Sequence, residues 1–307
     1  MYAYVGQRVA ATIPVLLGVS LLVFSMLQLV PGDPVRLMLS EFQTTPEQVA
    51  RLRSQLHLDE PLPVQFGRFL WNALHGDLGT SIRTRRPVTT EIADNFPSTL
   101  QLAAAGLAVA AIVGVSLGIV AATHQQSWLE LGSMLVALLG VSMPSFWLGL
   151  LLIFAVSLRL RLLPATGGGD LQHLVLPALT LGLGAAAILA RLTRSSMLEV
   201  LRQEYVTTAR AKGLREWVVI GRHALKNALI PVVTIFGLQF GQLLAGTFVV
   251  ETVFARPGLG RLIVDGILNK DFPMVQGVVL VVAVSYVLVN LLVDLVYAML
   301  DPRIRYA

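Results

Sequence analysis

The sequence predicts an all-α membrane protein with six transmembrane helices. Of its 307 residues, 55% are hydrophobic and only 13% are charged, whereas globular domains carry about 25% charged residues. The hydrophobic residues gather in six runs, and each run reaches the roughly 20 residues that a helix needs to cross a bilayer. A soluble domain could not bury this much apolar side-chain surface in its core. We therefore predict a polytopic membrane protein in which one membrane domain uses the whole length.

The excess of basic residues is explained by membrane topology and not by binding to nucleic acid. The formal net charge is +5 and the pI is about 9.9. Lysine and arginine flank the apolar runs, where the positive-inside rule accounts for them. The chain contains no cysteine, which excludes disulfides, thiolate chemistry and cysteine-bound zinc. We expect membrane lipid around the protein and no nucleic-acid partner.

The first apolar run is Val9–Leu29, which is long enough to span the membrane. A signal peptide would have a shorter apolar region and a small-residue cleavage site. This run ends instead in Leu29-Val30-Pro31-Gly32-Asp33-Pro34, a cluster typical of a turn. Residues 1–34 are therefore predicted to hold a retained first transmembrane helix with its N-terminal flank.

A polar segment, residues 35–97, follows and is too long for a simple turn. Residues 45–48 (Thr-Pro-Glu-Gln) form a helix start, with threonine as N-cap and glutamine at the third helical position. Residues 64–74 place apolar side chains at helical spacing, which predicts an amphipathic helix lying on the membrane or on other spans. We interpret the basic run Arg83–Arg86 as a solvated loop. The segment is thus expected to be partly helical.

Five further apolar runs lie within residues 98–307, which we predict to form the core. They are Ser98–Ala122, Leu129–Leu158, Leu174–Leu192, Leu229–Val253 and Val275–Leu300. Gly114 and Gly118 lie four residues apart within a span, as do Gly237 and Gly241, and such small residues let helices approach closely. The first pair also fits the Gly-x-Ser-x-Gly pattern of a hydrolase nucleophile, but without the strand-turn-helix context of that motif. We assign it to packing and expect no catalytic residue.

The distribution of lysine and arginine predicts the orientation. With six spans, both termini lie on the same side as the turn at 123–128 and the loop at 191–228. That side carries eleven basic residues, against five in the short loops of the other side. Residues 35–97 are left out because the rule is unreliable for long segments. Both termini and the 191–228 loop are predicted to be cytoplasmic, and residues 35–97 extracytoplasmic.

The 191–228 loop carries eight of the 23 basic residues and has the features of a folded element. Residues 199–212 are rich in helix formers, and Gly213 stops this helix as a C′ glycine would. Residues 216–226 predict a second short helix with apolar positions such as Trp217. A loop that only sets topology explains the charge, but not the apolar residues or the glycine break. We interpret the loop as a docking element.

This loop resembles the coupling loop of permeases from binding-protein-dependent ABC importers, in the dipeptide and oligopeptide branch. The residues that carry the resemblance are Thr208–Gly213, followed by Arg222–Pro231. The general family motif opens with Glu-Ala-Ala, whereas this chain has Thr207, Thr208 and Ala209 there, with Glu204 as the nearest acid upstream. Other similar segments occur in the family's order along the chain: Pro31–Pro34, Gly76–Ser81, Glu251–Phe254, Pro257–Gly260 and Asp301–Tyr306.

The resemblance implies a pore formed with a second, homologous permease in a bacterial or archaeal cytoplasmic (inner) membrane. Two ATPase subunits, which would bind ATP and Mg, would power it, and an extracytoplasmic substrate-binding protein would deliver the substrate. This chain is expected to bind no cofactor or metal and to be no enzyme. None of its lysines, Lys212, Lys226 and Lys270, is followed by the Ser or Thr of a P-loop. The substrate stays open among dipeptides, longer peptides, glutathione and nickel complexes.

The resemblance places the contact with the ATPase in the cytoplasmic loop. The residues are Thr207, Thr208, Ala209, Arg210, Ala211, Lys212, Gly213, Leu214 and Arg215. Arg210, Lys212 and Arg215 are expected to pair with acidic groups on the ATPase, which gives specificity more than affinity.

Polar residues within spans are candidates for the pore lining, namely Gln239, Gln242, Asn290 and Asp294. Such side chains are costly in a membrane, so they mark either a transport pathway or hydrogen bonds between helices. Both interpretations stay open. Glu251 and Arg256, near the outer mouth, belong to a region that is a candidate for contact with the binding protein.

Two other classes compete with this interpretation. A secondary transporter driven by an ion gradient would have discontinuous spans in repeated halves and an acid near the midplane. The spans are instead predicted to be even, no repeat is detectable, and Asp294 lies near one end of its span. A membrane scaffold without transport would explain the loop but not the polar residues inside spans.

Overall fold

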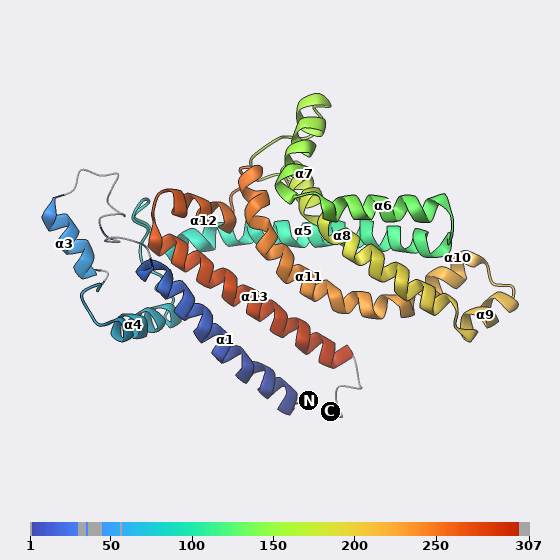
Figure 1. Cartoon of the computed structure of the whole chain (residues 1–307), viewed down its shortest axis with the longest axis horizontal. Coiled ribbons are helices and arrows are strands. Elements are labelled where there is room, and N and C mark those ends of the chain that lie inside the picture. The colour runs from blue at the N-terminus through green and yellow to red at the C-terminus, as the bar shows by residue number, and fades with distance from the viewer. Residues whose placement is uncertain (1, 30–34, 36–44, 56, 301–307) are drawn as a thin grey trace. The chain divides into compact units, whose positions relative to one another are not determined.

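Helices make up the regular structure of the chain (Figure 1). The computed structural model describes all residues except 1, 30–34, 36–44, 56 and 301–307. Within the described residues, five helices are long and apolar enough to cross a membrane, or six if one bent pair is counted as a span. The predicted all-α membrane fold is therefore confirmed. The chain divides into two units, Met1–Ser98 with Pro257–Ala307, and Thr99–Arg256.

The first unit contains α1 (Tyr2–Gln28), α3 (Pro46–Gln55), α4 (Leu62–Leu74), the start of α5 (Val88–Thr123), α12 (Leu259–Leu268) and α13 (Phe272–Leu300). α1 lies along α13, and the side-chain amide of Gln276 donates to the carbonyl oxygen of Val23 at 3.0 Å. The rings of Phe66 and Phe69 on α4 pack on Phe24 of α1, with centroids 5.4 and 6.0 Å apart. The amphipathic helix predicted at 64–74 thus lies against a span.

The start of α3 has the predicted capping arrangement. The N–H of Gln48 donates to Thr45 Oγ1 at 3.4 Å, and the N–H of Thr45 donates to Gln48 Oε1 at 3.1 Å. These reciprocal bonds are those of a capping box, which satisfies donors that the first helical turn leaves unpaired.

The basic run Arg83–Arg86 is exposed and lies outside the helices, as predicted for a solvated loop, and contacts that the sequence did not predict hold it in place. It lies in a closed turn whose ends pair as an antiparallel bridge between Thr80 and Pro87. Arg86 forms ion pairs with Glu91 and Asp94 on the first turns of α5. The run itself does not indicate these partners, because they follow it by a helical turn or more and become its neighbours only when α5 forms.

The second unit is organised around α8 (Gln172–Leu201). The rest of α5, α6 (Trp128–Ser142), α7 (Ser145–Leu152), its π-helical continuation η1 (Ile153–Arg159) and α11 (Leu225–Val253) belong to the same unit. Leu181 and Leu189 of α8 form a buried core with Leu102 of α5 and Val232 of α11. In α8, 67% of the apolar window is buried, against 33% or less in the other spans. α8 is therefore the central helix of this unit.

Glycines let α5 approach α8 closely. A Cβ added at Gly114 would lie 2.6 Å from the carbonyl oxygen of Ala186, and one added at Gly118 would lie 2.5 Å from Thr193 Cβ. Any side chain at these positions would push the helices apart, so the packing role predicted for this pair is confirmed.

One predicted span is not straight. The run Leu129–Leu158 is interrupted at Met143 and Pro144, and the pieces Trp128–Ser142 and Ser145–Arg159 are bent by 108°. Pro144 lacks a backbone N–H to continue the first helix and stands as the N-cap of α7. The expectation that all spans are even was therefore wrong at this span.

Candidate functional site

The candidate site follows α8, beyond the apolar part of that helix. α8 has 30 residues and is therefore about 45 Å long, whereas the hydrocarbon core of a bilayer is about 30 Å thick. The apolar run ends near Leu192, so residues 193–201 carry the chain about 14 Å farther along the helix axis. The loop that follows is thus held away from the apolar layer by a rigid helix.

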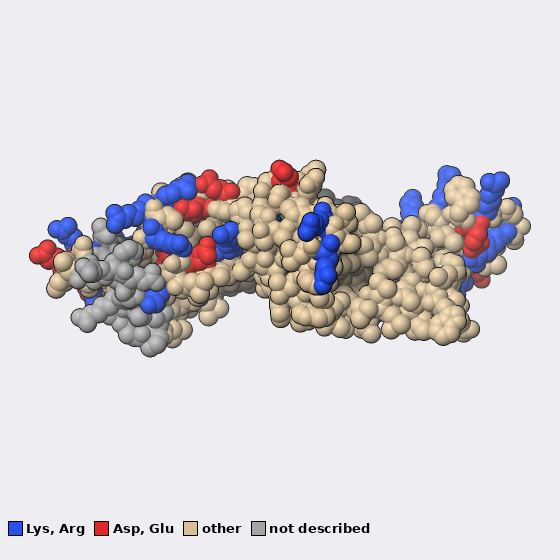
Figure 2. Space-filling view, turned by 90° about the horizontal axis from the view of Figure 1, so that it is seen from above, with Lys and Arg blue, Asp and Glu red and all other residues tan. Residues whose placement is uncertain are grey.

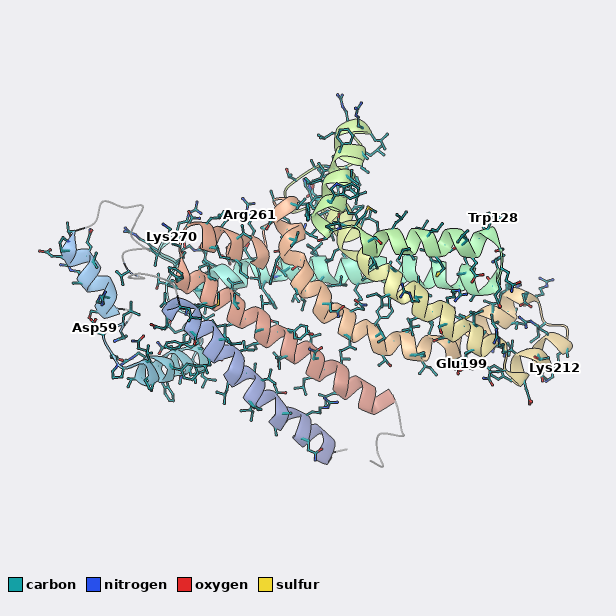
Figure 3. The ribbon with its side chains drawn as sticks, in the orientation of Figure 1. Asp59, Trp128, Glu199, Lys212, Arg261 and Lys270 are labelled. Atoms are coloured by element: carbon teal, nitrogen blue, oxygen red, sulfur yellow. The ribbon has the colours of Figure 1, made fainter. Side chains whose placement is uncertain are left out.

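The loop folds as helix, glycine turn and helix, with boundaries that differ from those predicted. α9 (Glu204–Ala211) is separated from α8 by Arg202 and Gln203, so Glu199 belongs to α8 and not to the loop helix (Figure 3). Gly213 has a φ of +74°, in the left-handed region that favours glycine, and it follows the end of α9 as predicted.

The second helix is not a separate short element. It starts as α10 (Glu216–Val218), continues through the π-helical turn η2 (Val219–Ala224) and enters α11, so that residues 216–253 form one continuous helical stretch. π-Helical turns inside helices occur frequently at functional sites. The loop is therefore connected directly to the span that follows it.

One face of α9 is buried. Val206 and Ala209 are 0% and 5% exposed, and they form a cluster with Val219, against which Val200 and Leu201 of α8 pack. Residues three apart lie on the same face of a helix. Burying a valine side chain contributes about 1.5–3 kcal/mol relative to leaving it exposed. This small core holds α9 in place.

The opposite face of α9 and the turn after it are exposed. We call residues Thr207–Trp217, apart from the buried Ala209, the loop surface. It contains eight of the nine residues predicted to contact an ATPase: Thr207, Thr208, Arg210, Ala211, Lys212, Gly213, Leu214 and Arg215. Leu214 and Trp217 are 40% and 71% exposed. Figure 2 shows basic side chains gathered at the end of the unit that carries α9 and α10, and Figure 3 shows Lys212 at its tip.

The arginines and the lysine of the loop surface differ in their partners. Arg210 forms a two-point ion pair with Glu216, with Nη2–Oε1 at 2.7 Å and Nε–Oε2 at 3.2 Å. The hydrogen bond with Glu216 raises the pKa of Arg210. Arg210 thus has an acidic partner within the chain. Lys212 and Arg215 have none among the described residues, so they are the charges available to another protein.

Two contacts that sequence analysis missed fix the loop and the end of α8. The hydroxyl of Tyr205 accepts a hydrogen bond from Asn227 Nδ2 at 2.7 Å, which ties α9 to the start of α11. Arg194 of α8 donates through Nε to Glu130 Oε1 of α6 at 2.9 Å. These partners are 22 and 64 residues apart in the sequence, and no local sequence pattern predicts such pairs.

A pocket lies beside the loop surface. It is lined by Ala122, Thr123, His124 and Gln125 at the end of α5, and by Leu201, Arg202, Arg210, Glu216 and Ile220. The short turn after α5 and the loop between α8 and α11 therefore lie side by side in this unit.

The pore candidates are divided between the two units. Gln239 and Gln242 lie on α11, where Gln239 is 4% exposed and Gln242 is exposed. Asn290 lies on α13, and its buried Oδ1 has no hydrogen-bond partner among the described residues. Asp294 follows on the same helix, with its side chain outside the described residues. The pore-lining role of these four residues stays a prediction.

Glu251 and Arg256 are not available for contact with another protein. They are 0% and 3% exposed, and Arg256 Nη2 donates to Gln101 Oε1 at 2.8 Å. Burial lowers the pKa of Arg256. Arg256 thus ties the residues just after α11 to α5, and these two buried side chains are not surface contacts, whereas the contact of the surrounding region with a binding protein stays a prediction.

Family comparisons cover nearly the whole chain. Residues 114–306 match the model described as binding-protein-dependent transport system inner membrane component, and residues 1–103 match the model for the N-terminal part of such components. A glutathione transport system permease protein from Pectobacterium atrosepticum is 47% identical over 306 residues, with 100% of both chains covered. A dipeptide transport system permease protein from Alkalihalophilus pseudofirmus is 43% identical over 334 residues, again with 100% of both covered.

Solved structures share the fold at low sequence identity. The chain is similar to one from a methionine ABC transporter in an inward-facing conformation, with a TM-score of 0.59, 16% identity and coverage of 68% of this chain and 96% of that one. A chain from an amino acid ABC transporter crystallised with histidines gives a TM-score of 0.54, 13% identity and coverage of 69% and 94%.

Proposed function

Because this chain belongs to the family of binding-protein-dependent transport system inner membrane components, we propose that it is a permease subunit of an ATP-driven importer of short peptides. The names of its relatives, which refer to glutathione and dipeptide transport, support this substrate class. The pore would form with a second permease, powered by two ATPase subunits that bind ATP and Mg and supplied by an extracytoplasmic binding protein. The lysine and arginine count supports cytoplasmic termini.

The observation that carries the proposal is the way the loop surface is fixed to the spans. Buried Ala122 of α5, Met197 of α8, Ala224 of η2 and Ala228 of α11 form one cluster at the base of the loop. Close-packed interiors transmit strain rather than absorb it. A displacement of α9 by an ATPase would therefore move the ends of three helices together. The Arg194–Glu130 contact extends this connection to α6.

The contact with the ATPase is tested by adding bulk to the loop surface. A Cβ at Gly213 meets nothing within 4 Å, so a tryptophan there would extend into space open to a partner, although its positive φ also strains the backbone. Lys212 has an ordinary φ of −75°, so Lys212→Trp adds bulk without that strain. We expect both Gly213→Trp and Lys212→Trp to insert in the membrane normally and to abolish ATP-driven peptide uptake into proteoliposomes.

Lys212→Ala is the matched comparison, because it removes the charge without adding bulk, and we expect its uptake to exceed that of Lys212→Trp by the effect of bulk alone. Co-purification of the ATPase subunits with each variant separates lost docking from lost transport. Full uptake by both tryptophan variants would contradict the assignment of the loop surface as the contact with the ATPase.

A further inference from the structure

α4 has two apolar faces, and the first packs on the end of α1 through the rings of Phe66 and Phe69 (Figure 1). The residues of the other face recur at intervals of three and four, as on one side of a helix. We call it the second face of α4, and it consists of Pro63, Val64, Gly67, Leu70, Trp71 and Leu74. Val64, Trp71 and Leu74 are 49%, 64% and 82% exposed. An apolar surface of this kind marks a contact with lipid or with another protein.

The second face carries no charge and has a polar border. Arg68 is the one charged residue of α4, and it stands beside the face, where it forms an ion pair with Glu60 at 2.9 Å. The ring of His75 packs on the ring of Trp71, with centroids 4.4 Å apart, so the face ends in a polar side chain. An uncharged apolar stripe bordered by polar residues is typical of a helix that lies at a membrane surface.

Two spans place α4 at the edge of the hydrocarbon layer. Phe24, on which α4 packs, lies five residues before the end of the apolar run of α1, or about 7.5 Å inside it. The side-chain amide of Gln276 donates to the carbonyl oxygens of Val23 and Phe24 at 3.0 and 3.5 Å. Gln276 lies one residue after the start of the apolar run of α13, or about 1.5 Å inside it. Both spans therefore place this contact within about one helical turn of the boundary between acyl chains and headgroups.

The chain that follows α4 is held at the same depth. A Cβ added at Gly277 would lie 3.3 Å from Leu78 Cβ, and one added at Gly79 would lie 3.7 Å from Pro273 Cβ. Pro273 and Gly277 belong to the first turns of α13, on either side of Gln276. α4 is thus fixed both at its middle and just after its end, which keeps the whole helix at the boundary.

We propose that the second face of α4 is a lipid-anchoring surface, immersed among the acyl chains just beneath the headgroups of one leaflet. The apolar faces of such helices lie about 5–10 Å into this boundary. Tryptophan is enriched there because its ring is apolar and its N–H is polar. A water-soluble partner would meet the protein beyond the headgroups. Interfaces between membrane helices are rich in small residues, whereas this face is formed mainly by bulky ones.

The test measures by spin labelling whether single positions contact lipid or water. The chain contains no cysteine, so a nitroxide on one introduced cysteine reports one position. The full-length chain is studied in nanodiscs, both alone and assembled with partner subunits that are free of cysteine. Val64→Cys and Leu74→Cys report the second face and retain Trp71. Leu22→Cys, 70% exposed in the apolar run of α1, is the lipid reference, and Arg51→Cys, exposed on α3, is the water reference.

The measured quantity is the ratio of collision rates with oxygen, which concentrates in lipid, and with a nickel chelate, which stays in water. For a face that lies within the boundary, we expect the ratios at Val64→Cys and Leu74→Cys to be at least about threefold higher than at Arg51→Cys and to approach that at Leu22→Cys. Ratios equal to that at Arg51→Cys would overturn the proposal, because the face would then lie in water.

A second permease that covers the face would give a different result. Collisions with both oxygen and the chelate would then be lost in the assembled importer and retained in the chain alone, and this outcome would overturn the proposal as well. The inference rests on the spans and not on transport. Lipid-like ratios in an assembled importer that takes up no peptide would therefore contradict the proposed function and support the lipid-anchoring surface.

Discussion

Replacing Gly182 by alanine should weaken the contact between α8 and α5. An added Cβ would lie 2.5 Å from the carbonyl oxygen of Gly106 and 2.7 Å from Val109 Cβ. Side chains do not approach a backbone oxygen this closely, so the helices must separate. Gly184, on the same helix, is the matched control, because its added Cβ would meet only the carbonyl oxygen of Gly140, at an ordinary 3.8 Å.

The size of the effect follows from two opposing contributions. Glycine inside a helix is about 0.5–1 kcal/mol less favourable than alanine, so both replacements gain this amount. Overpacking a well-filled site costs about 1–3 kcal/mol. At Gly182 we expect the upper part of this range, because the obstacle is the backbone rather than a side chain that can rotate away. Gly182→Ala should therefore be about 2–3 kcal/mol less stable than Gly184→Ala.

The assay is unfolding of both variants in mixed micelles with increasing SDS, followed by circular dichroism. Gly182→Ala should unfold at a lower SDS fraction than wild type, and Gly184→Ala at the same or a higher one. The reasoning is refuted if the two variants unfold together. Because α8 leads into the loop surface, we also expect Gly182→Ala to reduce peptide uptake per assembled complex.

Three further predictions concern the loop and the turn at Thr80–Pro87. Ala209→Asp would bury a charge under α9, so limited proteolysis should cut the loop after α8 much faster than in wild type. Thr208→Asp places the same charge on the exposed face of α9, so its cleavage should stay close to wild type, and equal cleavage of the two variants would contradict the assignment of the two faces. Asp271, just before α13, accepts hydrogen bonds from Ser81 Oγ, from the N–H groups of Ile82 and Arg83, and from the N–H of Met274 as an N-cap would. Asp271→Ala removes a cap worth about 1 kcal/mol and charge-assisted bonds worth about 1.5–3 kcal/mol, so limited proteolysis should cut the turn at Thr80–Pro87 much faster than in wild type. Glu216→Gln breaks an exposed pair with Arg210 that is worth under about 1 kcal/mol, so its thermal midpoint in detergent should stay close to wild type, and a large drop would contradict this estimate.

Features set by local chemistry could be predicted from the sequence. The apolar runs place the spans because length and hydrophobicity alone decide which segments can cross a bilayer. Gly213 marks the end of α9 because a left-handed C′ residue costs glycine nothing. The cap at Thr45 likewise depends on residues three apart.

Features set by distant partners could not be predicted. Ser81 and Asp271 are 190 residues apart, so the hydrogen bond between them could not be predicted from the sequence around the Arg83–Arg86 run. Ala209 belongs to the family motif, but only the packing of Val219 against it shows that it supports α9 instead of facing a partner. The bend at Pro144 also could not be predicted from the proline alone, since Pro177 lies inside α8 without a break.

The bend at Pro144 bears on the mechanism, because discontinuous spans are typical of ion-driven transporters. In those proteins the breaks come in corresponding positions of two repeated halves, and the freed backbone groups bind the ion. Here one bent pair occurs within the described residues. Its first helix ends with the N–H of Met143, which donates to the carbonyl oxygen of Leu139 at 3.3 Å, and the missing N–H of Pro144 removes the next helical hydrogen bond. The loop between α8 and α11 is exposed and is fixed to several spans, and its apolar and basic surface is suited to a protein rather than to an ion. Energy for transport should therefore enter the chain there.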